Sequence, residues 1–229
     1  MNGVRQNIDA ARQRGETVLS EFDSKRILAA YGIPVTRESL VADANAAVTA
    51  ATKIGFPVVV KGCAPGLAHK TELDLVAVGL ADATAVHGAA SRLLPRLPAG
   101  ARILVQEMVS GRRELMLGLI RDSQFGPCVS LGAGGIFAEA LADVCFRIAP
   151  FGRVEAMTML DELKTASVYG AARGMPAVDR NTLADALTAL GNIGIDHPEI
   201  REIDINPMIV TGSRPIAVDA LVVLESLGQ

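Results

Sequence analysis

The run E-I-D-I-N-P near the C-terminal end of the chain carries oxygen-donating side chains at every second position: Glu202, Asp204 and Asn206. Because side chains alternate along a strand, all three would lie on one face. Asp219 follows across a short hairpin, where it could lie near Asn206. Carboxylate and amide oxygens suit Mg²⁺, which keeps several waters and shares phosphate oxygens. The pattern therefore predicts either a magnesium site or a solvated, charged strand face.

Two other features could bind phosphate. Lys61 follows the apolar run F-P-V-V-V, so its ammonium group is expected either to be solvated at the strand end or to contact an anion. The run G-A-G-G-I-F-A-E, residues 132–139, offers closely spaced glycines whose backbone N–H groups can cradle phosphate oxygens. Its spacing matches neither a Walker A loop nor the dinucleotide-binding fingerprint, and an ordinary tight turn would have the same composition.

Four further ionisable residues could take part in binding or chemistry. Glu107 and Glu114 flank the run M-V-S-G-R-R, where a carboxylate could accept from ribose hydroxyls and main-chain groups could read an adenine edge; the alternative is two surface glutamates. Arg147, among apolar residues, could neutralise phosphate or pair with Asp143. His69 lies in a loop-like segment between two strand-like runs. Three readings are open for it: a surface residue, a phosphate ligand or a participant in the chemistry.

The elements that must position these residues alternate between helix and strand in the first half of the chain. Caps, apolar periodicity and Gly or Pro breakers set their limits. In order, we expect a polar helix over residues 4–14, a helix from Ser20 to Gly32, a helix from Asp43 to Gly55, strands over 56–60 and 75–80, and a helix from Asp82 to about Pro95.

Antiparallel strands dominate the second half. The runs 101–109 and 113–122 alternate like paired strands joined by the turn S-G-R-R, and 126–132 would be the third strand of that sheet. We further expect a strand over 144–150, helices over 152–164 and 179–192, and a closing hairpin of 202–210 with 215–224.

This order of elements predicts an α+β fold in two lobes and not a doubly wound parallel sheet. The expected domains are a polar helical extension over residues 1–15, an N-terminal lobe over 16–105 and a C-terminal lobe over 106–229.

Composition limits the classes of function. Half of the 229 residues are hydrophobic and 21% are charged, which supports a packed core. The net charge of −3 and the 3% aromatic content argue against nucleic acid as a partner. Apolar runs stay below the roughly 18 residues of a membrane span, the N-terminus lacks the apolar core of a signal peptide, and the three cysteines lack metal-ligand spacing. We expect a cytoplasmic protein without a membrane partner.

The order of the motifs along the chain is more specific than any one of them. The runs P-V-V-V-K, A-H-K-T-E, V-Q-E-M-V-S-G-R-R-E, F-G-P-C-V-S-L-G-A-G-G-I-F-A-E, D-V-C-F-R-I-A-P and E-I-D-I-N-P-M-I-V together resemble the ATP-grasp domain of the NDP-forming acyl-CoA synthetases. These are the β subunits of ADP-forming acetyl-CoA synthetases and their fused relatives, related to the succinyl-CoA synthetase β subunit. The resemblance covers roughly residues 16 to 225 and implies an ATP-grasp fold, in which two α/β lobes hold ATP between them.

The resemblance implies a role for each matching residue. Lys61 matches the lysine that contacts ATP phosphates, and Glu107 and Val109 match the hinge near adenine and ribose. Glu114 matches a second acid on the nucleotide side, and the glycine pair of the second lobe corresponds to Gly134 and Gly135. The Mg²⁺ ligands correspond to Asn206 and Asp219, with Asp204 in the acidic place two residues before the asparagine.

His69 matches the histidine of the family segment H-K-S-D-x-G-G-V, which is a proposed second phosphoryl carrier after a phosphohistidine in the CoA-binding part. Imidazole is neutral at pH 7 and nucleophilic, and it leaves well from phosphorus once protonated. The chain departs from the family where Asp74 and Leu75 replace the two glycines. Glycines there would allow unusual backbone angles, and Asp74 adds a negative charge near the arriving phosphate.

The implied reaction converts acyl-CoA, ADP and phosphate reversibly into acid, CoA and ATP. The chain has no room for the CoA-binding and ligase domains, so the resemblance implies a separate CoA-binding α subunit as partner, with Mg²⁺ and ATP or ADP as cofactors. Two alternatives stay open: a catalytically idle or regulatory nucleotide-binding module, and a free-standing ATP-grasp ligase that forms an acyl-phosphate. The histidine beside Lys70 favours the synthetase, because acyl-phosphate ligases need no histidine carrier.

Overall fold

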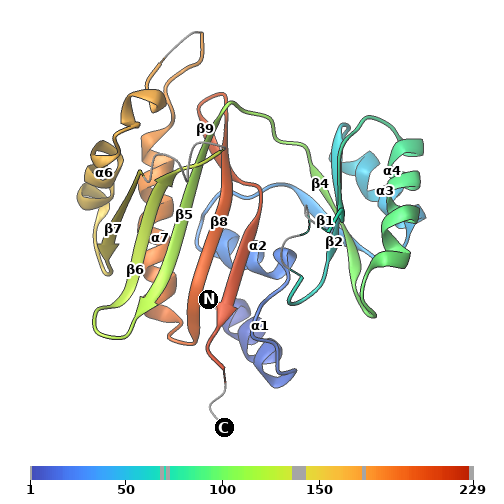
Figure 1. Ribbon diagram of the computed structural model, residues 1–229, viewed down its shortest axis with the longest axis horizontal. Coiled ribbons are helices and arrows are strands. Elements are labelled where there is room, and N and C mark those ends of the chain that lie inside the picture. Colours follow the sequence, from blue (N-terminus) through green and yellow to red (C-terminus); the bar gives the residue numbers. More distant parts are fainter. Residues whose placement is uncertain (1, 68–69, 71–72, 136–142, 172–173, 227–229) are drawn as a thin grey trace. The chain divides into compact units, whose positions relative to one another are not determined.

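The chain forms two compact units, each built on its own antiparallel sheet (Figure 1). The computed structural model describes residues 2–67, 70, 73–135, 143–171 and 174–226. Unit 1 comprises Met1–Val18, Asp23–Val35 and Val109–Gln229, and unit 2 comprises Leu19–Phe22 and Thr36–Met108. This mixed architecture of helices and antiparallel sheets confirms the predicted α+β class.

Unit 2 carries a sheet in the order β1-β4-β2-β3, with two helices packed against it. Alternate residues of β2 and β4, such as Val58, Val60 and Val105, meet small helix residues in an apolar core. Alanines on the helices allow close packing on the sheet. The elements are β1 (Glu38–Val41), α3 (Ala44–Ile54), β2 (Val58–Cys63), β3 (Val76–Leu80), α4 (Ala83–Leu93), the 3₁₀ turn η1 (Leu94–Arg96) and β4 (Arg102–Glu107).

Aspartate caps define both helices of unit 2. Asp43 accepts a hydrogen bond from the N–H of Ala46, and Asp82 accepts one from Ala85, at 2.8 Å in each case. These bonds satisfy N–H groups that have no partner within the helix. Gly55 ends α3 with a positive φ of 98°, as its glycine predicted. Both helices therefore begin where the sequence predicted.

Unit 1 carries the larger sheet, in the order β10-β8-β5-β6-β7, with β9 paired to β8. Helix α7 packs on β5 and β6, and α6 packs on α7 and β7, so one face of the sheet is covered (Figure 1). The elements are β5 (Arg113–Asp122), β6 (Gly126–Ala133), β7 (Val144–Ile148), α6 (Arg153–Glu162), η2 (Ala166–Tyr169), α7 (Arg180–Asp196), β8 (Ile200–Thr211), β9 (Arg214–Ala217) and β10 (Ala220–Leu224). The predicted third strand and closing hairpin are confirmed by the pairing of β6 with β5 and of β9 and β10 with β8.

The N-terminal helices α1 (Asn2–Gln13) and α2 (Glu21–Ala30) are joined to the far end of the sequence. Val18 forms a β-bridge with Val223, and Val35 forms one with Ala217. The hydroxyl of Ser24 accepts from the N–H of Val222 at 3.1 Å. These contacts explain why most of the first 35 residues group with unit 1, whereas the sequence analysis placed residues 16–105 in one lobe.

The expected pairing of residues 101–109 with 113–122 is wrong. Strand β4 pairs with β1 and β2 in unit 2, and β5 pairs with β6 and β8 in unit 1. Alternating apolar residues identify each run as a strand, but they do not identify its partner. The residues between β4 and β5 therefore connect two sheets and do not close a hairpin.

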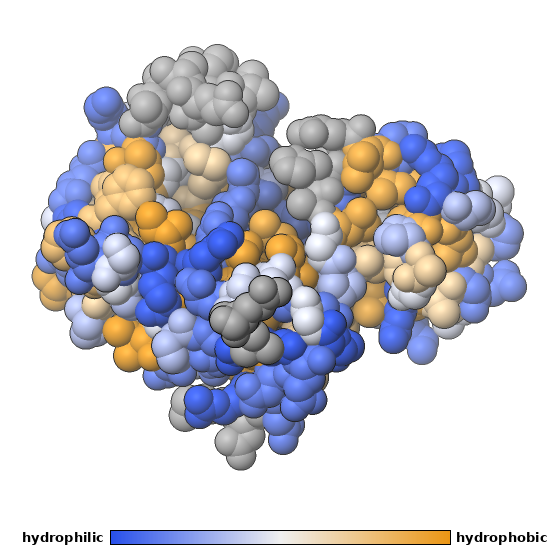
Figure 2. Space-filling model, turned by 60° about the horizontal axis from the view of Figure 1, so that its bottom comes forward, coloured by the Kyte–Doolittle hydropathy of each residue, from blue (hydrophilic) through white to orange (hydrophobic). Residues whose placement is uncertain are grey.

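The surface combines hydrophilic groups with separate apolar patches, as the face in Figure 2 shows. Within unit 1, alternate side chains of β7 are exposed and apolar: Val144, Phe146 and Ile148. Within the described part of the chain, no helix is both long enough and apolar enough to cross a membrane.

Candidate functional site

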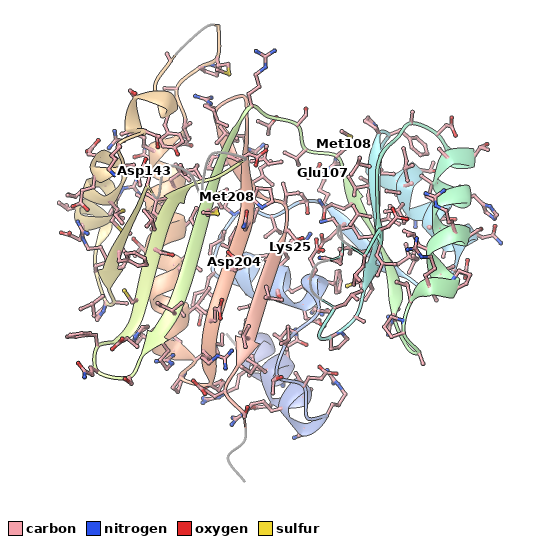
Figure 3. The ribbon with its side chains drawn as sticks, viewed as in Figure 1. Lys25, Glu107, Met108, Asp143, Asp204 and Met208 are labelled. Carbon is pink, nitrogen blue, oxygen red and sulfur yellow. The ribbon has the colours of Figure 1, made fainter. Side chains whose placement is uncertain are left out.

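Strand β8 presents the predicted oxygen donors on one face. Along this strand Ile203 and Ile205 are buried, while Glu202, Asp204 and Asn206 are partly or fully exposed between them. The alternation follows from the two-residue period of a strand, because each buried isoleucine turns its neighbours to the opposite face. The structure thus confirms that these three side chains share a face (Asp204 is labelled in Figure 3).

Asp219 lies in the connection between β9 and β10, at the level of Asn206. Ala220 pairs with Ile205, and the N–H of Val218 donates to the carbonyl of Pro207 at 3.0 Å. These two backbone contacts place the residue between them opposite the asparagine. One carboxylate oxygen of Asp219 also accepts from the N–H of Ala220 at 2.9 Å, which orients the side chain.

The electrostatics of this region favour a cation. Burial, reinforced by the charges of Glu202 and Asp219, raises the pKa of Asp204 to about 6. Carboxylates placed so close together repel one another, and a bound divalent cation would relieve that repulsion. The described residues include no group of three or more His, Cys, Asp and Glu side chains arranged for a metal. The amide oxygen of Asn206, waters and phosphate oxygens would complete the shell, a donor set that fits Mg²⁺.

Lys25 is a charged neighbour of this region that the sequence analysis missed. Its side chain, on α2, is fully buried, and its ammonium group donates to the carbonyl of Val218 at 3.3 Å, directly before Asp219 (Figure 3). The signal was a lysine three residues before the fully buried Leu28, hence on the core side of the helix.

The glycine pair and Glu114 are brought together in unit 1. The N–H of Gly134 donates to the carbonyl of Glu114 at 2.9 Å, and a Cβ at Gly134 would lie only 2.8 Å from the carbonyl carbon of Glu114. Only glycine permits this close approach. Gly135 has a φ of +80°, and a Cβ there would lie 3.6 Å from the carboxylate of Glu114. A glycine turn beside an acid is thus fixed at the ends of β5 and β6.

Lys61 lies within β2 and not at its end. All six residues of this strand are buried, and the Lys61 ammonium lies 2.7 Å from a carboxylate oxygen of Glu21. Lys70 contacts the other oxygen of the same carboxylate. The alternative of a solvated strand end is therefore wrong, because the Lys61 side chain is buried and its ammonium group is paired with the carboxylate of Glu21. Glu21, the first residue of α2, was not predicted from the sequence as a partner of this lysine.

Glu107 ends β4 and contacts Arg37 with both carboxylate oxygens. The backbone N–H of Arg37 donates to one oxygen at 2.8 Å, and its guanidinium Nε donates to the other at 2.7 Å. Val109 follows in the connection toward β5 and is half-buried. The carboxylate is thus held in place beside the chain that leaves β4 (Glu107 is labelled in Figure 3).

His69 lies outside the described residues, but the position that departs from the family pattern is described. Asp74 has a φ of +53°, the positive value that glycine adopts most readily. Leu75, which follows, is buried in the core of unit 2. Aspartate is one of the few other residues that tolerate this conformation. Asp74 therefore has a backbone conformation that glycine would also adopt readily.

Arg147 does not pair with Asp143. Its guanidinium contacts two acids of α6, Glu155 at 2.5 Å and Glu162. Asp143 instead accepts from Thr165 and from the N–H of Lys164. Burial opposes ionisation of this carboxylate, but these hydrogen bonds outweigh it and lower the pKa of Asp143. Both side chains thus stabilise the packing of β7 and the turn after α6, and neither is directed to phosphate by these contacts.

Comparison with known proteins places the chain among ATP-dependent ligases. The family model described as an ATP-grasp domain matches residues 10–224. The β subunit of ADP-forming acetate–CoA ligase I from Pyrococcus furiosus is 34% identical, with 96% of this chain and 97% of the relative covered. ADP-forming acetate–CoA ligase I from Archaeoglobus fulgidus is also 34% identical over 96% of this chain, but the match covers 35% of that longer protein.

A solved structure is similar over nearly the whole chain. The dinucleotide-forming acetyl-coenzyme A synthetase 1 of Ca. Korarchaeum cryptofilum is 37% identical, with a TM-score of 0.87 over 97% of this chain and 100% of that chain. That structure contains coenzyme A and Mg-AMPPCP, and its phosphohistidine segment points towards the nucleotide binding site.

Proposed function

The chain belongs to the ATP-grasp family of ADP-forming acetate–CoA ligase β subunits, and from this we propose that it binds the nucleotide in an ADP-forming acyl-CoA synthetase. The observation that carries the proposal is the group of oxygen donors on β8, with Asp219 opposite Asn206 and a raised pKa at Asp204. The reaction would convert acyl-CoA, ADP and phosphate reversibly into acid, CoA and ATP.

Residues of unit 2 and residues of unit 1 are each proposed to bind nucleotide. In unit 2, Lys61 would contact phosphate oxygens and Glu107 would lie near adenine and ribose, with Arg37 fixing its carboxylate. In unit 1, Val109 would contact the base and Glu114 would lie on the nucleotide side. The turn at Gly134 and Gly135 would offer the N–H of Gly135 to phosphate, since the N–H of Gly134 already donates to the carbonyl of Glu114.

Asp204, Asn206 and Asp219 would hold the magnesium ion of the Mg-nucleotide. When bound, Mg²⁺ neutralises charge on the phosphate oxygens during phosphoryl transfer. The Lys25 ammonium, through the carbonyl of Val218, would keep the chain beside Asp219 in position. The crowding of carboxylates around Asp204 supports this assignment, since it makes the region attractive to a divalent cation.

His69 would carry the phosphoryl group. A nitrogen of its neutral imidazole would attack phosphorus in a phosphohistidine of the CoA-binding partner, so that one N–P bond forms as another breaks. A terminal oxygen of ADP would then attack, the N–P bond at His69 would break, and ATP would form with neutral imidazole left behind. Asp74, which stands in place of a family glycine, has the positive φ that glycine adopts readily. The replacement is therefore compatible with a phosphoryl-carrier role for His69.

The proposed partner is a CoA-binding α subunit. The relative from Pyrococcus furiosus is a separate β subunit of similar length, whereas the one from Archaeoglobus fulgidus is much longer. The acyl group would be selected mainly by this CoA-binding partner. We also place the protein in the cytoplasm, where its three free cysteines would stay reduced.

Calorimetric titration of the full chain with Mg-ADP or Mg-ATP tests the nucleotide site. We expect saturable binding that is strongly weakened by Asn206→Ala combined with Asp219→Ala. The matched control is Asp185→Ala combined with Asn192→Ala, two exposed positions on α7. Wild-type protein that does not bind, or binding that survives the first pair of changes, would refute the assignment.

Phosphoryl transfer is tested with the cognate α subunit, acyl-CoA and labelled phosphate. Acid-labile label is expected on the wild-type chain and absent from His69→Gln. Equal labelling of both chains would remove His69 from the mechanism while leaving the nucleotide site intact.

A further inference from the structure

A row of four polar side chains joins the end of α2 to the turn between α7 and β8 in unit 1. The hydroxyl group of Tyr31 donates a hydrogen bond to a carboxylate oxygen of Asp196 at 2.8 Å, and its oxygen lies 3.1 Å from Nε2 of His197. On the other side of the imidazole ring, Nδ1 lies 3.4 Å from a carboxylate oxygen of Glu199. The order along the row is therefore Asp196, Tyr31, His197 and Glu199.

The inner end of this row is enclosed and the outer end is open. The side chains of His197 and Glu199 are only 6% and 9% exposed, respectively. The ring of Tyr31 packs edge-on against the imidazole, with the ring centroids 6.1 Å apart. Asp196, at the outer end, is exposed. Water can therefore replace a lost partner at Asp196 more easily than at the two enclosed side chains.

The number of hydrogens in the row decides which contacts can exist together. A tyrosine hydroxyl carries one hydrogen, and an ionised carboxylate carries none. The hydrogen of Tyr31 points to Asp196, so Nε2 of His197 must donate to the hydroxyl oxygen. Glu199 can only accept, so Nδ1 must donate as well. All three contacts are satisfied at once only when the ring is protonated on both nitrogens, or when the same additional proton lies on Glu199.

Loss of that proton changes one contact. A neutral imidazole has a single N–H, which the enclosed carboxylate of Glu199 retains. Nε2 then becomes an acceptor, so the hydroxyl hydrogen of Tyr31 turns to it and the exposed Asp196 is released to water. Burial, together with the hydrogen bond to Asp196 and the charges of Asp196 and Glu199, raises the pKa of Tyr31, so the hydroxyl keeps its hydrogen in both states.

Other charged residues near the ring act mainly on the backbone. The guanidinium of Arg121, on β5, donates to two carbonyls at the end of α7, at 2.7 Å and 3.1 Å, the second being that of His197 itself. The backbone N–H of Glu225 donates to the carbonyl of Glu199 at 2.8 Å, while the side chain of Glu225 is exposed. Arg121 opposes protonation of the ring, whereas Glu199 at one end and Asp196 at the other favour it.

We propose that this row is a pH-sensitive latch, which ties the end of α2 to Asp196 only while His197 is protonated. Imidazole is the side chain that ordinarily titrates between about pH 5 and 8. The hydrogen bond from Tyr31 to Asp196 belongs to the protonated state, so its contribution to stability is present below that titration and is lost as pH rises through it. The inference does not depend on the proposed nucleotide site.

The latch restrains a helix that also supports the candidate metal region. Helix α2 carries Lys25, whose ammonium group donates to the carbonyl of Val218, directly before Asp219. Tyr31 follows the last residue of the same helix. Release of Asp196 at alkaline pH would therefore loosen the end of α2 on the side away from its first turn.

A double-mutant cycle at two pH values tests the latch in the full-length chain. Tyr31→Phe and Asp196→Ala each remove one end of the outer hydrogen bond, and the melting temperatures of both variants and of their combination are measured by calorimetry. At about pH 5.5 we expect each single change to lower the melting temperature by about 2–4 °C, with little further loss in the combination. At about pH 8.5 Asp196→Ala should have almost no effect and the two changes should be independent.

A control cycle uses a carboxylate that has no part in the row. Asp185 is exposed on α7, so Asp185→Ala combined with Tyr31→Phe should be additive at both pH values. Coupling between Tyr31 and Asp196 that is equal at the two pH values would overturn the proposal, because the hydrogen bond would then not depend on the proton of His197.

NMR titration of the wild-type protein follows that proton directly and needs no variant to be stable. The chain has three histidines, and the resonance of His197 is identified by its absence from His197→Gln. We expect the ring to become doubly protonated over the same pH range in which the coupling to Asp196 appears. His87→Gln, at an exposed position of α4, should leave this titration unchanged. A His197 ring that stays neutral down to about pH 5 would also overturn the proposal.

Discussion

Arg96 holds Asp74 in a backbone conformation that few residues other than glycine adopt. Its guanidinium donates to the carboxylate of Asp74 at 2.8 Å and to the backbone carbonyl of the same residue at 3.0 Å. These hydrogen bonds, together with the positive charge of Arg96, lower the pKa of Asp74. Asp74 thus has a conformation that glycine would also adopt, and its negative charge is paired with Arg96.

Substitution of Asp74 should separate backbone shape from charge. Asp74→Gly keeps access to a φ of +53° and should leave nucleotide binding and melting temperature near wild type. Asp74→Val places a β-branched side chain in a left-handed conformation and should lower the melting temperature by several degrees. Differential scanning calorimetry measures the melting temperatures of both variants. If Asp74→Val has the melting temperature of the wild-type protein, backbone strain does not restrict which residue can occupy this position.

Gly134→Ala should disturb the glycine turn because the added methyl group meets backbone atoms of Glu114 and Leu115 at 2.8 and 2.9 Å. Backbone atoms cannot move aside cheaply, so we expect a loss of about 1–3 kcal/mol in the free energy of unfolding. Nucleotide affinity should fall as well. Gly88→Ala is the control, since its site in α4 is open and alanine favours a helix. A Gly134→Ala variant as stable as wild type would show that the turn can shift.

Arg113→Met should be strongly destabilising. The buried guanidinium donates to the carbonyls of Gly170, Pro176 and Gly212, which belong to different segments of unit 1. Loss of a charged donor to buried carbonyls costs about 1.5–3 kcal/mol. Urea unfolding monitored by circular dichroism measures the change.

The neighbouring arginine provides the control for that measurement. Arg112 is exposed, so Arg112→Met removes the same charge without opening the interior. Equal effects at the two positions would mean that charge, and not the three hydrogen bonds, accounts for the loss.

The stability of the metal-free protein should depend on pH through Asp204. Burial and the charges of Glu202 and Asp219 raise the pKa of Asp204 to about 6, from about 3.9 in an unfolded chain. The folded state therefore favours the protonated form, and the contribution of this group to stability declines as pH rises from about 4 to about 6. Asp204→Asn should remove that decline.

Melting temperatures measured from pH 4.5 to 8 in the presence of EDTA check this dependence. The quantity of interest is the difference between Asp204→Asn and wild type, since other groups titrate in the same range. Asp185→Asn, at an exposed position of α7, is the control. A difference that does not grow between pH 4.5 and about 6 would mean that Asp204 ionises as it would in water.

Local features of the fold could be predicted from the sequence, because their causes are local. Asp43, Asp82 and Asp179 each accept hydrogen bonds from the first turn of the helix they begin. The alternation of Ile203 and Ile205 with polar residues likewise fixed the face of Asp204 and Asn206. The assignment of β4 and β5 to different sheets could not be predicted, since strand alternation carries no information about the partner strand.

The buried charges of the site were the least predictable part. Lys61 was expected either to be solvated at a strand end or to contact an anion, because a lone lysine is rarely buried. Its anionic partner in the interior is Glu21, forty positions earlier in the sequence. Arg147 was linked to Asp143 by proximity in sequence, but Glu155 and Glu162 are one helix away and face it. In each case the partner is supplied by packing between two different elements, whether they are adjacent in sequence, as β7 and α6 are, or forty residues apart.

Unit 1 combines segments from both ends of this chain, and this affects when it can fold during synthesis. The bridge from Val18 to Val223 and the hydrogen bond from the N–H of Leu224 to the carbonyl of Thr17 join these residues to β10, which is synthesised after the other strands of unit 1. Residues 36–108 of unit 2 emerge together and can pack while synthesis continues. The N-terminal helices must wait for β10, so chains released before that strand is complete would leave their apolar faces open to aggregation.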